Sequence, residues 1–366
     1  MKKVLFCTPY EGISNSNIGG ISVWAKAIVE HYECVNSDVE LVVHPLDRKT
    51  YVRGVNAVVR LWSGVVEYLS LVRNVKRHLQ SESFDAIHLC TTASLGLLKD
   101  WMILRYAKSK GIKTFLHFHC GRIPEIMQRK NWETWLLRRV LAMTDAPIVM
   151  DEKSFHVLEE CSVGGVKYIP NPLSSFVDKM VERLKNDMER VENRLLFVGH
   201  VVDIKGVYEL VRACSTMSEV ELRMVGHVED AVRDRLLEIA SNRSGEWLHF
   251  TGGLSREETI GEILSAEVLV APSYIEGFPN VILEAMACGT PIVASRVGAI
   301  PEMLAHGKCG VLIEPRSVES ICSGIGEMLS DDDKRGTFAQ LAKQRVKQCY
   351  SIASVWNQLT EVWLGM

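Results

Sequence analysis

Two glutamates flank a helix-entry signal in the sequence EGFPNVILEAMACGTP, which spans residues 276–291. Pro279 suits the start of a helix, Asn280 suits its N-cap, and Gly289 suits the residue that stops it. Glu276 then lies in the loop before the helix and Glu284 lies one turn inside it. A carboxylate can accept hydrogen bonds from both hydroxyls of a sugar diol, so the pair could hold one elongated ligand. A surface acid followed by a helical acid is the simpler alternative, but the strand-like run before the loop favours a site.

The same helix start suits a diphosphate. The first backbone N–H groups of a helix, here those of residues 281–283, have no partner within the helix and lie at its positive end. Upstream, the sequence FVGHVVDIKG at residues 197–206 follows a strand and opens a helix. Gly199 would let the backbone approach a ligand closely, and Lys205 would bring a positive charge to phosphate. A solvated lysine at a helix start is the alternative for Lys205.

Two further signals lie in the first half of the chain. Gly19 and Gly20 come after the first predicted strand and before a helix, where either a phosphate loop or a plain turn is expected. His117 and His119 alternate within the run TFLHFHCG, so they share one face of a strand, and His119 lies at its carboxyl end. His119 therefore lies where parallel α/β sheets bind ligands. The alternative is a histidine of the core.

The elements that must position these residues alternate between strand and helix. Short β-branched runs predict buried strands and the stretches between them have helical periodicity, which is typical of βαβ units with parallel sheets. The polar span 172–193 interrupts this rhythm and separates two series. We predict an α/β chain of two Rossmann-like domains that face each other across a cleft. They comprise residues 1–172 and 173–350, and residues 351–366 form a helix that returns to the N-terminal domain. The predicted strands are Val4–Cys7, Val39–Val43, Ala86–Leu89, Thr114–Phe118, Pro147–Val149, Lys167–Ile169, Arg194–Val198, Glu221–Val225, Leu248–Thr251, Val268–Val270, Ile292–Ala294 and Gly310–Ile313.

The segment 276–291 resembles the E-x7-E signature of family-4 retaining glycosyltransferases, which have the GT-B fold. The resemblance extends over nearly the whole chain, and Ala294–Leu304 is similar to the stretch that follows the signature. It implies that the C-terminal domain binds a nucleotide-diphosphate sugar and that the N-terminal domain binds the acceptor. Glu276 would contact the donor sugar and Glu284 the ribose. The remaining implied donor contacts are Gly19, Gly20, Gly199, His200, Lys205, Gly253, Leu254, Phe278, Pro279, Asn280, Val281 and Ile282.

The same resemblance assigns His119 as the active-site histidine and, with Glu276 and Lys205, as a catalytic residue. One position departs from the family pattern. His200 stands where the family usually has an arginine that clamps the diphosphate, and histidine is shorter and only partly charged at neutral pH. Either Lys205 and the helix start neutralise most of the diphosphate charge, or donor affinity falls at alkaline pH.

Charge and composition exclude several other classes. The first 180 residues carry 23 Lys and Arg against 18 Asp and Glu, or +5, and the remainder carries 19 against 27, or −8. This balance does not indicate a nucleic-acid partner. Ten cysteines without CxxC spacing favour reduced thiols in a cytosol and no metal site. The opening apolar run is too short for a signal peptide, and no run reaches the length of a membrane span. Basic, tryptophan-bearing stretches at residues 49–80 and 122–139 fit either a solvated face or an anionic membrane surface.

These observations predict a cytoplasmic, retaining hexosyltransferase that needs no metal or cofactor. It would move a sugar from a nucleotide-diphosphate donor, a UDP-sugar by family habit, to a glycan or lipid-linked acceptor of a bacterial surface polysaccharide. Two alternatives remain open at this point. One is a nucleotide-sugar epimerase or a phosphorylase on the same scaffold, and the other, motivated by His200, is a catalytically degenerate sugar-nucleotide-binding protein. The lack of a GxGxxG motif after either first strand disfavours a dehydrogenase.

Overall fold

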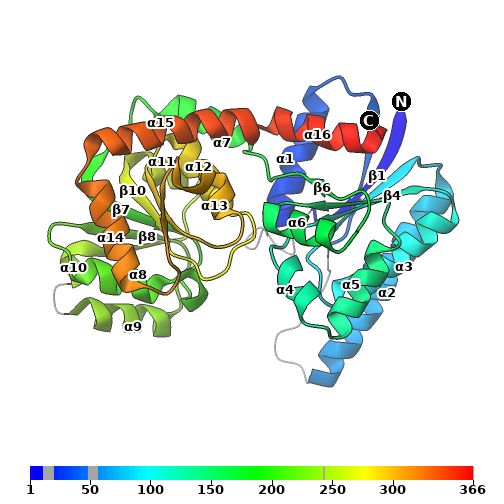
Figure 1. Cartoon of the computed structure of the whole chain (residues 1–366), viewed down its shortest axis with the longest axis horizontal. Coiled ribbons are helices and arrows are strands. Elements are labelled where there is room, and N and C mark those ends of the chain that lie inside the picture. The colour runs from blue at the N-terminus through cyan, green and yellow to red at the C-terminus, as the bar shows by residue number, and fades with distance from the viewer. Residues whose placement is uncertain (11–19, 48–56, 242–243, 366) are drawn as a thin grey trace. The chain divides into compact units, whose positions relative to one another are not determined.

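The computed structural model describes residues 1–10, 20–47, 57–241 and 244–365 of the chain. These residues form two compact units (Figure 1). Unit 1 comprises Met1–Pro172 together with Ile352–Met366, and unit 2 comprises Leu173–Ser351. The chain therefore passes from one unit to the other twice.

In its described residues, unit 1 is built on a six-stranded parallel sheet in the order β2-β1-β3-β4-β5-β6. Its strands and helices are β1 (Lys2–Thr8), α1 (Gly20–Cys34), β2 (Val39–Pro45), α2 (Ala57–Ser81), β3 (Ala86–Thr91), α3 (Gly96–Ser109), β4 (Lys113–Phe118), α4 (Ile123–Gln128), α5 (Trp132–Leu141), β5 (Ala146–Val149), α6 (Glu152–Glu160), β6 (Lys167–Tyr168) and α16 (Ile352–Leu364).

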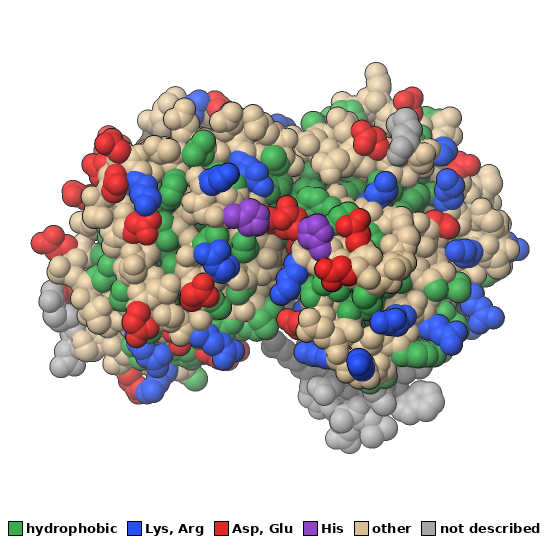
Figure 2. Space-filling model, in the orientation of Figure 1, with side chains coloured by type: hydrophobic (Ala, Val, Ile, Leu, Met, Phe, Trp, Pro, Cys, Tyr) green, Lys and Arg blue, Asp and Glu red, His purple; other side chains and the backbone are tan. Residues whose placement is uncertain are grey.

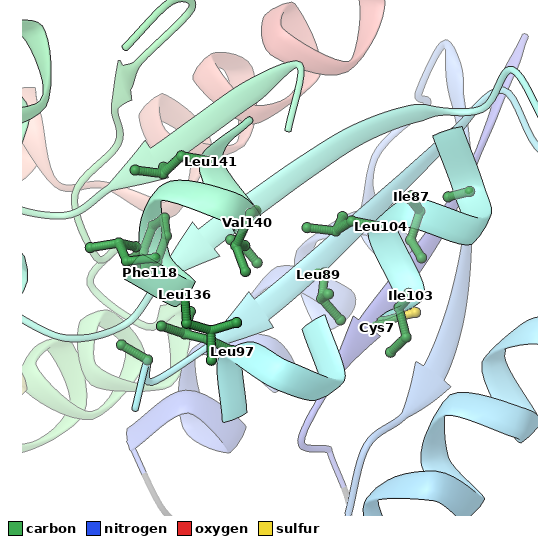
Figure 3. Close-up of a cluster of buried hydrophobic side chains, with 14 of the residues drawn as sticks. Cys7, Ile87, Leu89, Leu97, Ile103, Leu104, Phe118, Leu136, Val140 and Leu141 are labelled. Carbon is green, nitrogen blue, oxygen red and sulfur yellow. The ribbon is translucent and has the colours of Figure 1, made fainter. Parts of the chain in front are cut away.

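Both faces of this sheet are buried, which explains why its strands are continuous apolar runs. Successive residues of β1 point to opposite faces. Leu5 and Cys7 join the core under α2, α3 and α5, whereas Val4 and Phe6 join the core under α1 and α16. Figure 3 shows the first of these cores, in which side chains of α3 and α5 pack onto β1, β3 and β4. The C-terminal helix α16 packs against α1, β1 and β2 of this unit.

Unit 2 repeats the scheme with the strand order β12-β11-β10-β7-β8-β9, again parallel throughout and counted over the described part of the chain. Its elements are α7 (Ser175–Leu184), β7 (Val191–Val198), η1 (Asp203–Lys205), α8 (Val207–Ser215), β8 (Glu221–Val225), α9 (Asp230–Ala240), α10 (Ser244–Trp247), β9 (Leu248–Gly252), α11 (Arg256–Ser265), β10 (Ala266–Ala271), α12 (Asn280–Cys288), β11 (Ile292–Ser295), α13 (Ile300–Met303), η3 (Ala305–Gly307), β12 (Val311–Ile313), α14 (Val318–Leu329) and α15 (Asp332–Cys349).

The predicted fold class is confirmed: every predicted strand is present within its unit, and the two sheets are parallel α/β sheets. In unit 2 the first strand, β7, lies beside the fourth, β10. From this pair the chain progresses outward in both directions, to β8 and β9 on one side and to β11 and β12 on the other. The loops that leave the carboxyl ends of β7 and β10 therefore diverge, and α/β sheets bind ligands at such a point.

Candidate functional site

An ion pair joins the two loops that diverge at this point of unit 2. Lys205 follows β7 and Glu276 follows β10, and their Nζ and Oε1 atoms are 2.6 Å apart. Ser273 Oγ donates a second hydrogen bond to the same oxygen at 2.7 Å. Glu276 is the more buried partner, with 14% of its side chain exposed against 30% for Lys205. The lysine thus keeps N–H donors directed toward solvent while the carboxylate is held from two sides.

The loop that carries Glu276 is fixed by backbone contacts on both flanks. On one side, Tyr274 N–H donates to the Ile204 carbonyl at 2.9 Å. On the other, Ala299 N–H donates to the Gly277 carbonyl at 2.9 Å. A Cβ on Gly298 would lie 2.7 Å from that Gly277 carbonyl oxygen, and its φ of +53° favours glycine. The Glu276 carboxylate therefore sits on a loop that two neighbouring segments hold in place.

Helix α12 begins directly after this loop, and its start differs from the prediction. Pro279, with φ −74° and ψ 118°, occupies the N-cap position, and Asn280 is the first helical residue. Asn280 was predicted as the cap, but a proline with fixed φ and extended ψ fills that position without a side-chain acceptor. No side chain caps α12 and no acid lies in its first turn. Ile282 N–H already donates to the Pro279 carbonyl at 3.2 Å, and no side chain satisfies the N–H groups that precede it, which could bind an anion. Gly289 ends the helix at φ 68°, as predicted.

Glu284 lies inside α12 and is partly buried. Burial raises the pKa of its carboxyl group, and the positive charge of Arg256 opposes that shift. A ligand that donates two hydroxyl hydrogen bonds would compensate for the lost hydration of this carboxylate. The other three predicted contacts in this segment differ in exposure: Phe278 and Ile282 are buried, whereas Val281 is half-buried.

The loops after β7, β8 and β9 are also joined edge to edge. Gly199 N–H donates to the Val225 carbonyl, and Gly226 N–H donates to the Gly252 carbonyl, each at 2.9 Å. No heavy atom lies within 4 Å of a Cβ built on Gly253, so the space beside that glycine is open. His200 is exposed and Leu254 is half-buried. The structure thus places the predicted residues of unit 2 along one edge of a single sheet.

The predicted residues of unit 1 have a different environment. Gly19 lies outside the described residues, and Gly20 begins α1. His119 follows β4 directly, and its ring lies 4.2 Å from that of His117, which confirms that the two share a face. His119 also contacts Trp24, with ring centroids 4.5 Å apart. His88, on β3, completes the group at 5.4 Å from His117.

These imidazoles are uncharged and mostly lack polar partners. Burial lowers the pKa of His88 and of His119 to about 3 and lowers that of His117 as well. Trp363 Nε1 donates to His88 Nδ1 at 3.1 Å, which leaves the proton of His88 on Nε2. Among the described residues, His88 Nε2, His119 Nε2 and both nitrogens of His117 have no hydrogen-bond partner.

Sequence reasoning missed several residues that shape these sites. Ser273 contacts Glu276 within one loop, Tyr274 contacts the loop of Ile204, and a Cβ on Gly206 would collide with the Pro272 carbonyl. His88 and Trp363 meet across 275 residues of sequence. The side chain of Asp331 caps α15 by accepting from Lys334 N–H at 2.9 Å. Within the described ranges, no group of three or more His, Cys, Asp or Glu side chains is arranged to hold a metal ion. No helix in those ranges has the length and apolarity to cross a membrane.

The sequence of unit 2 is similar to a known protein family. Residues 179–345, all within unit 2, match the family model of Glycosyl transferases group 1. The MMP alpha-(1->4)-mannosyltransferase of Mycolicibacterium hassiacum is 35% identical over 179 residues, which are 48% of this chain and 43% of that protein. The chain thus spans less than half the length of the curated relatives it matches.

Solved structures are similar over the full length of the chain. Sucrose-phosphate synthase from Thermosynechococcus elongatus superposes with a TM-score of 0.76 at 19% identity, over 100% of this chain and 99% of that one. Anabaena Alr3699/HepE in complex with UDP superposes with a TM-score of 0.74 at 18% identity, over 100% of both chains. These likenesses show a GT-B-like fold.

Proposed function

We propose that this chain is a retaining glycosyltransferase that takes a hexose-type sugar from a nucleotide-diphosphate donor without a metal ion. The match of residues 179–345 to the group 1 glycosyl transferases supports the reaction class. The observation that carries the proposal is the Lys205–Glu276 ion pair beside the uncapped start of α12. We assign donor binding to unit 2 and acceptor binding to unit 1.

The chemistry follows from where charge develops. When the bond between sugar and diphosphate breaks, negative charge grows on the leaving phosphate oxygens. Lys205 and the N–H groups at the start of α12 would stabilise that charge from fixed positions, which is a large contribution to catalysis. Lys205 has three N–H donors, so it can contact phosphate while it retains Glu276.

The two glutamates would divide the recognition of the donor. Glu276 is held by Lys205 and Ser273, so its second oxygen can orient the sugar near its reacting carbon. Glu284, one turn inside α12, would accept the ribose hydroxyls. The backbone of residues 278–282 would contact sugar and phosphate, and Gly199, His200, Gly253 and Leu254 would line the nucleotide. His119 is the catalytic residue that we assign to unit 1, as a neutral hydrogen-bonding partner of the sugar.

The donor is proposed to be a UDP-sugar, and the structure of Anabaena Alr3699/HepE with UDP supports this choice by likeness of fold. The acceptor is proposed to be a glycan on a lipid carrier, used on the cytoplasmic side of the membrane to build a cell-envelope polysaccharide. The net charge of +5 on the first 180 residues supports peripheral contact with an anionic membrane.

The decisive experiment incubates the purified chain with a panel of nucleotide sugars and lipid-linked acceptors, with and without a chelator. We expect release of a nucleoside diphosphate, a product whose anomeric configuration by NMR equals that of the donor, and no effect of the chelator. An epimer formed without acceptor would instead identify an epimerase. Tight UDP binding without turnover, restored by His200→Arg, would identify a degenerate binding protein.

A further inference from the structure

Unit 1 exposes a group of large apolar side chains around the start of α3 and along α5. Trp132 and Trp135 are 55% and 59% exposed, and Leu95 and Leu98 are 60% and 51% exposed. We call these four residues the tryptophan face. Two tryptophans exposed to this degree on one helix are unusual for a surface that meets only water.

A hydrogen-bond network shows that the four side chains belong to one surface. Ser94 Oγ donates to Glu133 Oε1 at 2.8 Å, and Arg122 donates to Ser94 Oγ at 2.7 Å. Ser94 precedes Leu95 and Glu133 follows Trp132, so the network joins the two ends of the tryptophan face. Arg122 belongs to the loop after β4 that begins with His119. The tryptophan face therefore lies at the carboxyl edge of the unit 1 sheet.

Helix α5 holds its tryptophans rigidly outward. Asn131 caps the helix in a capping box, and four apolar residues of α5 are buried in the core under α5. Those residues are Leu136, Leu137, Val140 and Leu141. On the opposite side of α5, Trp132 and Trp135 have no such core to enter. Helix α2, which packs against α3, exposes Val66 and Leu69 in addition.

Four exposed cations lie close to the two tryptophans in sequence, and one of them, Arg129, is 3.7 Å from the Glu125 carboxylate. Arg129, Lys130, Arg138 and Arg139 are all exposed, and the Arg139 guanidinium lies 5.2 Å from the Trp135 ring. Figure 2 shows basic side chains interspersed with hydrophobic ones in the region of α4 and α5. The indole ring of tryptophan favours the boundary between lipid headgroups and acyl chains, and arginine and lysine attract anionic headgroups.

We propose that the tryptophan face docks on an anionic lipid bilayer, with Trp132 and Trp135 entering the headgroup region and the four cations contacting lipid phosphates. This inference rests on the proposed lipid-linked acceptor, which such docking would bring to the carboxyl edge of unit 1. A second copy of the chain is disfavoured as the occupant, because a symmetric contact through this face would bring the cations of both copies into one interface.

The test measures binding of the full chain to vesicles by co-sedimentation. The vesicles contain phosphatidylcholine alone or phosphatidylcholine and phosphatidylglycerol in equal parts. We expect binding to the anionic vesicles that weakens as salt is raised. Trp132→Ala with Trp135→Ala should abolish it. Arg138→Gln with Arg139→Gln should weaken it by about fivefold for each charge removed.

Matched controls lie on unit 2, where Leu341 is 39% exposed and Arg212 and Arg235 are exposed. Leu341→Ala and the pair Arg212→Gln and Arg235→Gln should bind vesicles like the wild type. Wild-type binding by the tryptophan variant would overturn the proposal. So would a wild type that binds no vesicles, or a dimer that the tryptophan variant converts to monomers. Binding of UDP without vesicles is measured in parallel, so a chain that binds vesicles but no nucleotide would refute the proposed function alone.

Discussion

The carboxyl edges of the two sheets differ in charge. That of unit 2 carries an ion pair, whereas that of unit 1 carries uncharged histidines. In unit 2, Lys205 and Glu276 form an ion pair at 2.6 Å that is partly open to solvent. In unit 1, His88, His117 and His119 are packed against each other and against Trp24, and burial keeps all three neutral. A site that must stabilise a diphosphate requires fixed charge, whereas a neutral imidazole can hydrogen-bond a sugar without attracting phosphate. The contrast therefore supports the division of tasks proposed for the two units.

The largest effect is expected from removing the fixed charge of unit 2. Lys205→Met should lower kcat about 10²- to 10³-fold, because a preorganised group that stabilises developing negative charge is lost. The measurement is nucleoside diphosphate release with donor and acceptor at saturation. Lys347→Met, which removes an exposed lysine of the same unit, should turn over like the wild type. Wild-type turnover by Lys205→Met would mean that unit 2 does not act through this charge.

A smaller effect is expected from moving the loop that holds Glu276. Gly298→Ala should lower the free energy of unfolding by about 1–3 kcal/mol, because the new Cβ strains the backbone at positive φ and displaces the Gly277 carbonyl. Donor turnover should fall along with stability. The control is Gly326→Ala within α14, where a Cβ meets open space and the change should stabilise by about 1 kcal/mol or less. Equal denaturation midpoints for the two variants would contradict the close approach.

Lowering the pH should reduce the folding stability of unit 1 more than that of unit 2. The pKa of His88 is about 3 in the folded state, below the value of about 6.5 in an unfolded chain. The unfolded state therefore binds the proton first as pH falls, and stability is lost from about pH 6.5 down to about pH 3. The slope for His88 alone is about 1.4 kcal/mol per pH unit, or about 2 kcal/mol between pH 7 and pH 5.

Hydrogen exchange by mass spectrometry at these two pH values would resolve the units separately. None of the described histidines of unit 2 is buried, and burial raises the pKa of Glu284, a shift that acid does not penalise. Protection should therefore fall in unit 1 first. His88→Gln keeps an acceptor for Trp363 and removes the titration, so it should flatten the loss. An unchanged acid response in that variant would show that other groups cause it.

The smallest effect is expected from replacing His200 of unit 2. His200 is exposed at the charged edge of unit 2, and His200→Arg adds a permanent cation there. We expect UDP affinity to rise about two- to fivefold, corresponding to about 0.5–1 kcal/mol for an exposed charge. Thermal shift with a UDP titration would measure it. An affinity that falls would indicate that the imidazole itself contacts the nucleotide.

The fold could be predicted because a strand buried on both faces leaves a local signature. Runs such as Val4–Cys7 are apolar at every position, and each proved to be a strand. The edge of unit 2 could be predicted for a similar reason, since Glu276, Pro279 and Gly289 are close in sequence. The ion pair that supports Glu276 could not, because Lys205 is 71 residues away in sequence and meets it only in the folded sheet. The N-cap was wrong by one residue, because Pro279 itself takes the cap conformation.

Helix α16 has a consequence for how the chain is made. Trp356 and Trp363 complete the core of unit 1, yet they are translated after the whole of unit 2. The core on the α1 side of the first sheet therefore cannot close until the residues of unit 2 have all been synthesised. The first unit to be synthesised is thus not the first to be finished.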